Sequence, residues 1–115
     1  MVTDISSADA SGGPENAARV SREGDRTILW FEGEFDIANN WLLADTMAKA
    51  IALDDGDLVV DLSETAFIGG ATVDVLLRGR TFLLERERAL TLRAPSSCAR
   101  RVIDLCGLTA LVDPP

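Results

Sequence analysis

The hydrophobic and polar positions along this chain predict strands and helices in alternation. Residues 17–21 and 27–33 have the pattern of two strands, and the turn at residues 22–25 between them predicts a β-hairpin. Residues 1–16 are small and polar and show no period. We therefore expect a mobile tail over residues 1–16 and a single domain over residues 17–115.

A first helix and a buried strand follow the hairpin. After Asn39 or Asn40, each a suitable N-cap, apolar residues recur at helical spacing until the acidic and glycine residues at 54–56 end the pattern. Residues 58–62 then form a nearly continuous apolar run, which is typical of a strand covered on both faces. These segments predict a β-α-β unit.

A second helix is expected to begin at the pair Gly69-Gly70 and to run to about Arg86. One face of it is marked by Val73, Leu76, Leu77, Arg80 and Leu84. A strand over residues 89–93 follows, and a third helix opens at Pro95-Ser96 and ends at Gly107. We place the apolar face of this third helix at Cys98, Val102, Leu105 and Cys106.

The predicted order is β-β-α-β-α-β-α-β, with residues 111–113 as a short edge strand. It is typical of an α/β fold in which helices pack on a mixed, mostly parallel sheet of four to five strands. Sites in such sheets gather outside the carboxyl ends of the strands. We therefore expect the loop at residues 63–72 to meet the turn at residues 34–36. Free N–H groups at the start of the second helix favour anions there.

The net charge of −8 and the pI near 4.4 limit the partners of the chain. An acidic surface repels nucleic acid and anionic lipid, and it serves either solubility or attraction to a basic protein. No apolar run approaches the ~20 residues of a membrane span, and the N-terminus lacks the pattern of a signal peptide. These features predict a cytoplasmic protein that binds no nucleic acid and does not insert into a membrane.

The chain contains no His and no Tyr. The usual general base and the commonest metal ligand are therefore missing, and we expect a non-enzymatic protein without a metal or cofactor. Cys98 and Cys106 lie too far apart along one helix for an intrachain disulfide. We predict reduced thiols packed in the core, with a redox role as the alternative. Trp30 and Trp41 should pack as well, although Trp41 could line a partner surface.

Three segments, in this order, resemble the STAS family, whose small domains are typified by bacterial anti-sigma factor antagonists and also occur at the ends of sulfate transporters. They are residues 31–36, 58–77 and 96–108, and the resemblance extends from about Ala18 to Val112. It implies a partner switch. An anti-sigma factor of the ATP-binding serine kinase type binds the STAS protein and releases its sigma factor. In many systems it also phosphorylates the STAS protein, which breaks the complex.

The phosphorylated Ser or Thr of the family lies in an Asp-Ser-Ser/Thr-Gly motif at the start of the second helix. This chain has Gly69-Gly70-Ala71-Thr72 there, so the Asp of the motif falls on Gly69 and its phospho-acceptor on Ala71. A methyl group cannot accept a phosphoryl group. Asp36 matches the acidic position that the family places beside this loop. One half of the acidic surround is retained and the other half is lost.

Thr72 carries a hydroxyl one residue after the usual acceptor position. Because one residue turns a helix by ~100°, this hydroxyl should point away from that position. Thr72 is either an alternative phosphorylation site or a first-turn Thr that bonds the backbone. The pair Gly69-Gly70 either permits positive φ or close backbone approach in a sharp turn, or cradles a phosphate.

We therefore expect an anti-sigma factor antagonist that is not inactivated by phosphorylation at the usual position. Its predicted partner-binding residues are Asp36, Phe67, Ile68, Gly69, Gly70, Ala71, Thr72, Val73 and Asp74. One alternative is a non-enzymatic STAS subunit of a membrane transporter complex. Another is a binding module that senses a nucleotide or phosphate at the start of the second helix. A homodimer through a face left open near the C-terminus is a further expectation.

Overall fold

A computed structural model of the chain describes residues 2–4, 16–53 and 55–112. Its elements, in order, are β1 (Val2–Asp4), β2 (Ala17–Glu23), β3 (Arg26–Phe35), α1 (Asn40–Leu53), β4 (Leu58–Asp61), β5 (Thr65–Ile68), α2 (Gly70–Leu84), β6 (Leu90–Arg93), α3 (Ser97–Leu105) and the short 3-10 helix η1 (Thr109–Leu111). The predicted α/β fold is confirmed. None of the helices in these ranges is long and apolar enough to cross a membrane.

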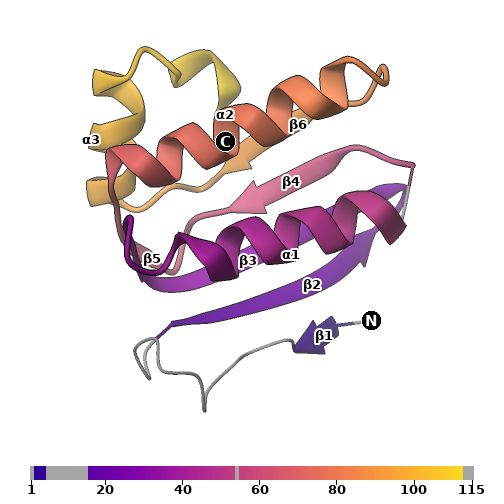
Figure 1. Cartoon of the computed structure of the whole chain (residues 1–115), viewed down its shortest axis with the longest axis horizontal. Coiled ribbons are helices and arrows are strands. Elements are labelled where there is room, and N and C mark those ends of the chain that lie inside the picture. The colour runs from indigo at the N-terminus through magenta and orange to yellow at the C-terminus, as the bar shows by residue number, and fades with distance from the viewer. Residues whose placement is uncertain (1, 5–15, 54, 113–115) are drawn as a thin grey trace.

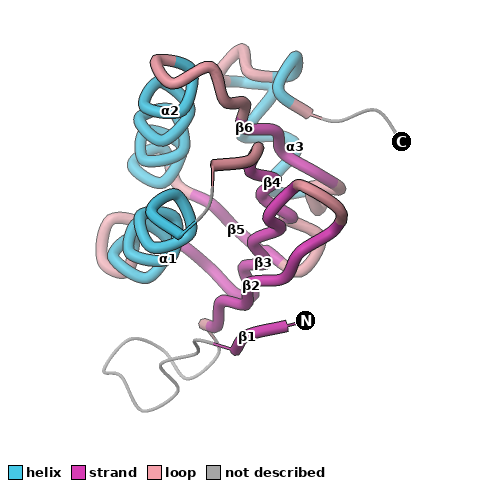
Figure 2. The backbone as a smooth tube through the Cα atoms, turned by 90° about the vertical axis from the view of Figure 1, so that its right-hand side faces the viewer, coloured by secondary structure: helices cyan, strands magenta, loops and turns pink. Residues whose placement is uncertain are grey.

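One mixed sheet joins the strands in the order β1-β2-β3-β4-β6, and β5 pairs with β3 beyond the end of β4. The pairs β1–β2 and β2–β3 are antiparallel, whereas β3–β4, β3–β5 and β4–β6 are parallel. The predicted hairpin turns at Gly24, whose φ of 64° lies in the left-handed region that glycine adopts without steric cost. Helices α1 and α2 lie side by side on one face of the sheet (Figures 1 and 2).

The sequence predicts neither β1 nor β5. Strand β1 lies within the segment expected to be a mobile tail, and residues 5–15 of that segment are outside the described residues. Strand β5 lies within the loop predicted at residues 63–72. At the other end, the expected edge strand is wrong, because η1 is followed by a single isolated bridge between Leu92 and Val112.

The main core lies between the sheet and helices α1 and α2. Leu29 and Phe31 of β3 and Val60 of β4 point into it and are fully buried. The inward face of α2 is mostly as predicted, but Leu83 fills the last buried position and Leu84 is exposed. At the C-terminal end of the helix, the buried face is therefore shifted by one residue from the predicted face.

The buried face of α3 differs from the prediction. Ala99 and Ile103 are fully buried, whereas Cys98, Leu105 and Cys106 are exposed. Two hydrogen bonds orient the start of this helix: the N-cap side chain of Ser96 accepts one from the Ala99 amide at 3.2 Å and donates one to the Thr65 carbonyl. The prediction of core packing for both thiols is therefore wrong.

The opposite face of the sheet carries a row of polar and aromatic side chains. Arg19, Trp30, Asp61 and Arg93 are register partners across β2, β3, β4 and β6, and we call them the cross-strand row. Trp30 lies between two inward-facing residues of β3, so it points to the other side. The guanidinium carbon of each arginine is 5.1 Å from the centroid of the Trp30 ring. Trp30 therefore packs as predicted, between two cations.

Asp61 is the buried carboxylate of this row, and its oxygens are well bonded. Oδ2 accepts a hydrogen bond from Arg93 Nε at 2.8 Å, and Oδ1 accepts bonds from the amide and hydroxyl of Ser63 at 2.9 and 2.6 Å. The hydrogen bond to Asp61 raises the pKa of Arg93 against the opposing effect of burial. Arg93 also reaches Glu23 near the hairpin turn, with 3.1 Å between Nη1 and Oε1.

Candidate partner-binding face

The end of β3 and the start of α2 meet at Asp36. Strand β5 runs parallel to the last residues of β3, with Phe35 in register with Ile68. The Gly69 amide donates a hydrogen bond to the Phe35 carbonyl at 2.9 Å. A Cβ atom on Gly69 would lie 3.5 Å from Cβ of Asp36. The predicted meeting of the loop with the turn at Asp36 is therefore confirmed.

Backbone geometry does not require the glycine pair. Gly69 is the N-cap of α2 with φ −91° and ψ 172°, an extended conformation open to any residue, and no side chain caps this helix end. Gly70 begins the helix, and a Cβ there would meet no atom within 4 Å. The explanation by positive φ is therefore wrong. The contacts of a Cβ on Gly69, at 3.5–3.7 Å, are ordinary van der Waals distances, so close approach does not demand glycine either.

Exposure separates the nine predicted partner-binding residues into two sets. The exposed or half-buried ones are Asp36, Phe67, Gly69, Gly70, Ala71 and Asp74, and the buried ones are Ile68, Thr72 and Val73. The buried side chains support the surface from beneath and are not part of it. The surface available to a partner is thus narrower than the sequence predicts.

Thr72 is fully buried, and its hydroxyl is bonded to another helix. Oγ1 donates a hydrogen bond to Oδ1 of Asn40, the first residue of α1. The predicted bond to the backbone is therefore wrong for the hydroxyl, although the Thr72 amide does donate to the Gly69 carbonyl at 3.1 Å. Its buried position leaves Ala71, and not Thr72, facing outward in the first turn of α2.

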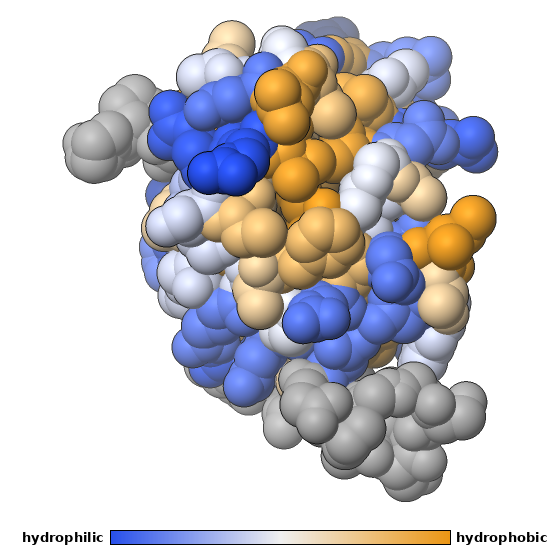
Figure 3. All heavy atoms as spheres, turned by 90° about the vertical axis from the view of Figure 1, so that its left-hand side faces the viewer, coloured by the Kyte–Doolittle hydropathy of each residue, from blue (hydrophilic) through white to orange (hydrophobic). Residues whose placement is uncertain are grey.

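Three large apolar side chains lie exposed around this first turn. Ile37 is 83% exposed, Trp41 47% and Phe67 39%. Figure 3 looks onto the end of the molecule where α1 and α2 begin, and it shows apolar spheres gathered there beside hydrophilic ones. The prediction that Trp41 packs is wrong, and its alternative role on a surface fits. The sequence predicts no role for Ile37, whose only signal is an isolated isoleucine in a polar turn.

The turn that carries Ile37 is held by side-chain hydrogen bonds. The amide of Asp36 donates to Asn39 Oδ1 at 2.8 Å, and Asp36 Oδ1 accepts from the Ala38 amide at 3.0 Å. Asn39 Nδ2 donates to the Glu34 carbonyl at 2.7 Å. Such local bonds fix an exposed turn before any partner arrives.

We define the partner-binding face as Asp36, Ile37, Trp41, Phe67, Gly70, Ala71 and Asp74. It combines three exposed apolar side chains with two carboxylates, of which Asp74 pairs with Arg78 at 2.9 Å. Within the described ranges, no group of three or more Cys, Asp or Glu residues could hold a metal ion. The arrangement can bind a protein surface, and Ala71 offers no oxygen for phosphoryl transfer.

The family of this chain can be established by comparison with known proteins. The family model described as "Mlab, STAS domain" matches residues 18–113. No curated protein sequence matches the chain significantly. A solved anti-sigma factor antagonist from Mycobacterium paratuberculosis is 20% identical with a TM-score of 0.74, over 100% of this chain and 87% of that one. An anti-sigma-factor antagonist (STAS) domain protein from Planctomyces limnophilus is 18% identical with a TM-score of 0.73, over 85% and 91%.

A transporter contains the same fold. The murine anion transporter Slc26a9 is 13% identical over 82% of this chain and 17% of its own length, with a TM-score of 0.68. At these identities the solved structures establish the architecture alone. Because the family model spans both the sheet and the partner-binding face, the chain belongs to the STAS domain family.

Proposed function

We propose that this chain is an anti-sigma factor antagonist that binds an anti-sigma factor of the ATP-binding serine kinase type and so frees a sigma factor. The observation that carries the proposal is the exposed apolar cluster of Ile37, Trp41 and Phe67 beside the first turn of α2. The likeness to two solved anti-sigma factor antagonists supports it. The chain acts by binding and not by catalysis.

The chemistry of the partner-binding face fits a protein partner. Large apolar side chains that gather on a surface mark interaction sites, and tryptophan is among the residues that contribute most to binding energy. Asp36 and Asp74 of the same face are exposed, so their carboxylates can pair with basic residues of the partner. The net charge of −8 would also speed association with a basic surface.

The proposed antagonist is not switched off at the usual position. Ala71 occupies that position and carries no hydroxyl. The neighbouring hydroxyl, that of Thr72, is buried and bonded to Asn40, so a kinase would have to open the start of α2 to reach it. The complex would therefore persist in the presence of ATP.

The test mixes the purified chain with the anti-sigma kinase of its source cell and measures the complex by calorimetry, with and without Mg-ATP. We expect micromolar or tighter binding that ATP does not reverse. The Ala71→Ser variant, which restores the acceptor hydroxyl, should bind equally well and be phosphorylated and released when ATP is added. Absence of a complex would contradict the binding function. Phosphate on Thr72 of the unaltered chain would contradict the missing switch.

A second candidate function is a non-enzymatic STAS subunit of a membrane transporter complex. The likeness to one segment of an anion transporter favours it. The same apolar cluster would then dock on a transporter ATPase. Affinity purification from native membranes distinguishes the two functions, since an ATPase would be recovered in one case and an anti-sigma factor in the other.

A further inference from the structure

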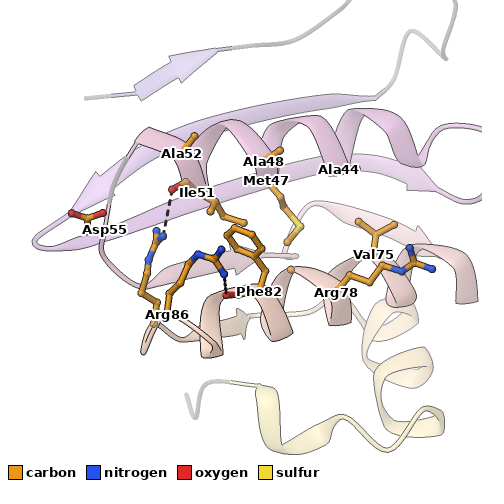
Figure 4. Close-up of a pocket in the computed structure, with 12 residues that line it drawn as sticks. Ala44, Met47, Ala48, Ile51, Ala52, Asp55, Val75, Arg78, Phe82 and Arg86 are labelled. Atoms are coloured by element: carbon orange, nitrogen blue, oxygen red, sulfur yellow. Dashed lines mark hydrogen bonds between the residues drawn. The ribbon is translucent and has the colours of Figure 1, made fainter.

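Helices α1 and α2 enclose a groove with a volume of about 670 Å³ (Figure 4). Its apolar residues come from both helices, chiefly Met47 and Ile51 of α1 and Val75, Gly79 and Phe82 of α2. This volume lies within the ~300–1,000 Å³ typical of small-molecule sites, which are mostly apolar with a few polar groups. On α2, the first residue that lines the groove is Val75, which directly follows Asp74. The groove shares no residue with the partner-binding face.

Gly79 shapes the floor of the groove. A Cβ at this position would lie 2.2 Å from Cε of Met47, so the methionine side chain rests directly on the backbone of α2. Methionine has three rotatable bonds and a polarisable sulfur, which let it adapt to an apolar guest. The floor can therefore follow the shape of a flexible alkyl chain.

The charges at the groove are opposite in sign to those of the whole chain. Three arginines and one aspartate line it, whereas the sequence has 11 basic and 19 acidic residues. Arg78 pairs with Asp74 at 2.9 Å, and Arg88 donates to the carbonyls of Ile51 and Gly56. The local excess of positive charge predicts an anionic group on the ligand.

Arg86 is the arginine best placed to receive that group. Its guanidinium carbon lies 3.5 Å from the centroid of the Phe82 ring, and Nη1 donates to the Phe82 carbonyl at 3.1 Å. Figure 4 shows this guanidinium beside the ring of Phe82. Arg86 Nη1 also lies 3.9 Å from Oε1 of the exposed Glu85. A guanidinium carries five N–H donors, so the bond to the Phe82 carbonyl and this long ion pair leave donors to bind the carboxylate of a ligand.

The other residues that line the groove restrict the class of ligand. Among the described residues that form it, no Ser, Thr, Asn or Gln is present. Sugars and nucleotides need several neutral donors and acceptors, because their buried polar groups must be paired. An apolar floor with a cation beside it suits an alkyl chain that carries a single anionic head.

We propose that the α1–α2 groove binds a monomeric amphipathic anion of the fatty-acid type, with the alkyl chain along Met47, Ile51 and Val75 and the carboxylate at Arg86. The proposal is independent of the anti-sigma function, because it uses none of the residues of the partner-binding face. The net charge of −8 favours a free amphiphile over the surface of an anionic membrane as its source.

The test titrates the full chain with sodium dodecanoate below its critical micelle concentration, followed by calorimetry and by amide shifts in two-dimensional NMR. We expect saturable one-to-one binding with shifts centred on Ile51, Gly79 and Phe82. Dodecyltrimethylammonium, which has the same tail and a cationic head, should bind at least tenfold more weakly. Equal binding of the two amphiphiles, or shifts centred on the partner-binding face, would overturn the proposal.

Two variants test separately how the groove binds the anionic head and the alkyl tail of the ligand. Arg86→Gln should weaken dodecanoate about tenfold, as expected for the loss of one charge-assisted hydrogen bond. Ala48→Trp, at an exposed position in the groove, should block the tail without unfolding the chain, which a thermal melt verifies. Arg101→Gln, on the exposed side of α3, is the matched control and should bind normally. Binding unaffected by both groove variants, or sedimentation with phosphatidylglycerol vesicles in place of monomer binding, would refute the site.

Discussion

The hydroxyl of Thr72 donates a hydrogen bond to Oδ1 of Asn40, which ties the first turn of α2 to the first residue of α1. Both helices begin at the partner-binding face. The bond therefore fixes the spacing of the two segments that carry Trp41 on one side and Ala71 on the other. Thr72 takes part in the site as a support and not as a contact.

Removing this donor should destabilise the fold modestly. Thr72→Val keeps the shape of the side chain but leaves Asn40 Oδ1 without its partner. We expect the free energy of unfolding to fall by about 1 kcal/mol, as for a typical buried hydrogen bond. Urea denaturation measures this change. Thr72→Ser keeps the hydroxyl and is the matched control, and a valine variant as stable as the unaltered chain would show that the bond contributes nothing.

The apolar cluster should dominate binding to the anti-sigma factor. Trp41→Ala and Phe67→Ala should each weaken the complex by about 2 kcal/mol, because truncation of a central aromatic residue has effects of this size. Their melting temperatures should change little, since both side chains are substantially exposed. Leu53→Ala, at an 83% exposed position at the far end of α1, is the control for calorimetry. An equal loss of affinity in this control would contradict the assigned surface.

The ion pair of buried Asp61 with half-buried Arg93 in the cross-strand row should show strong energetic coupling. Arg93→Met leaves the Asp61 carboxylate buried beside an apolar side chain, and it should lower the free energy of unfolding by about 3 kcal/mol. Adding Asp61→Asn removes the stranded charge, so the double variant should be more stable than the sum of the two single effects predicts. Chemical denaturation of the four proteins gives this coupling. Additive effects would mean that the pair does not act as a unit.

Asp104 offers a test by pH. Its hydrogen bond from Thr109 at 2.7 Å, with a second from Arg100 at 3.2 Å, lowers the pKa of its carboxyl. A lowered pKa in the folded state stabilises the fold above the ordinary pKa of the group, and this contribution is lost as the pH falls through the lowered value. In Thr109→Val the pKa of Asp104 should rise toward its ordinary value. Carbon-detected NMR titration measures it, and an unchanged pKa would exclude Thr109 as the main cause.

The two thiols should react in the native state. Cys98 and Cys106 are both exposed, so a disulfide reagent in excess should label two thiols per chain without denaturant. Labelling should be complete in the native state, because both thiols are accessible to the reagent. If either thiol is protected until urea is added, that thiol lies in the core, as the sequence suggests, and the exposed position is wrong.

Helix α3 shows why the sequence alone misplaced those thiols. Cys98, Val102 and Cys106 share one helical face, and Ala99 and Ile103 share the adjacent one, so both stripes are apolar. The choice between them depends on how Ser96 is held. Its hydroxyl bonds the carbonyl of Thr65, which is distant in the sequence and cannot be placed from periodicity.

Local signals explain what could be predicted. The hairpin at Gly24 and the helix that starts at Asn40 depend on turn and capping residues within a few positions, and both are confirmed. Strand β5 has only four residues, and its pairing with β3 arises from contacts distant in the chain. The same reasoning applies to the site. Topology predicts that Asp36 meets the start of α2, but the exposure of Ile37 depends on the completed fold.

The cross-strand row also bears on how the chain folds as it is synthesised. Arg19 lies in the second strand and Arg93 in the last, yet both flank the ring of Trp30. The hairpin of β2 and β3 therefore leaves the ribosome with one side of that ring uncovered, and it stays so until β6 emerges. Long-range closure of this kind is slow, because the loop entropy is lost before the contacts are gained.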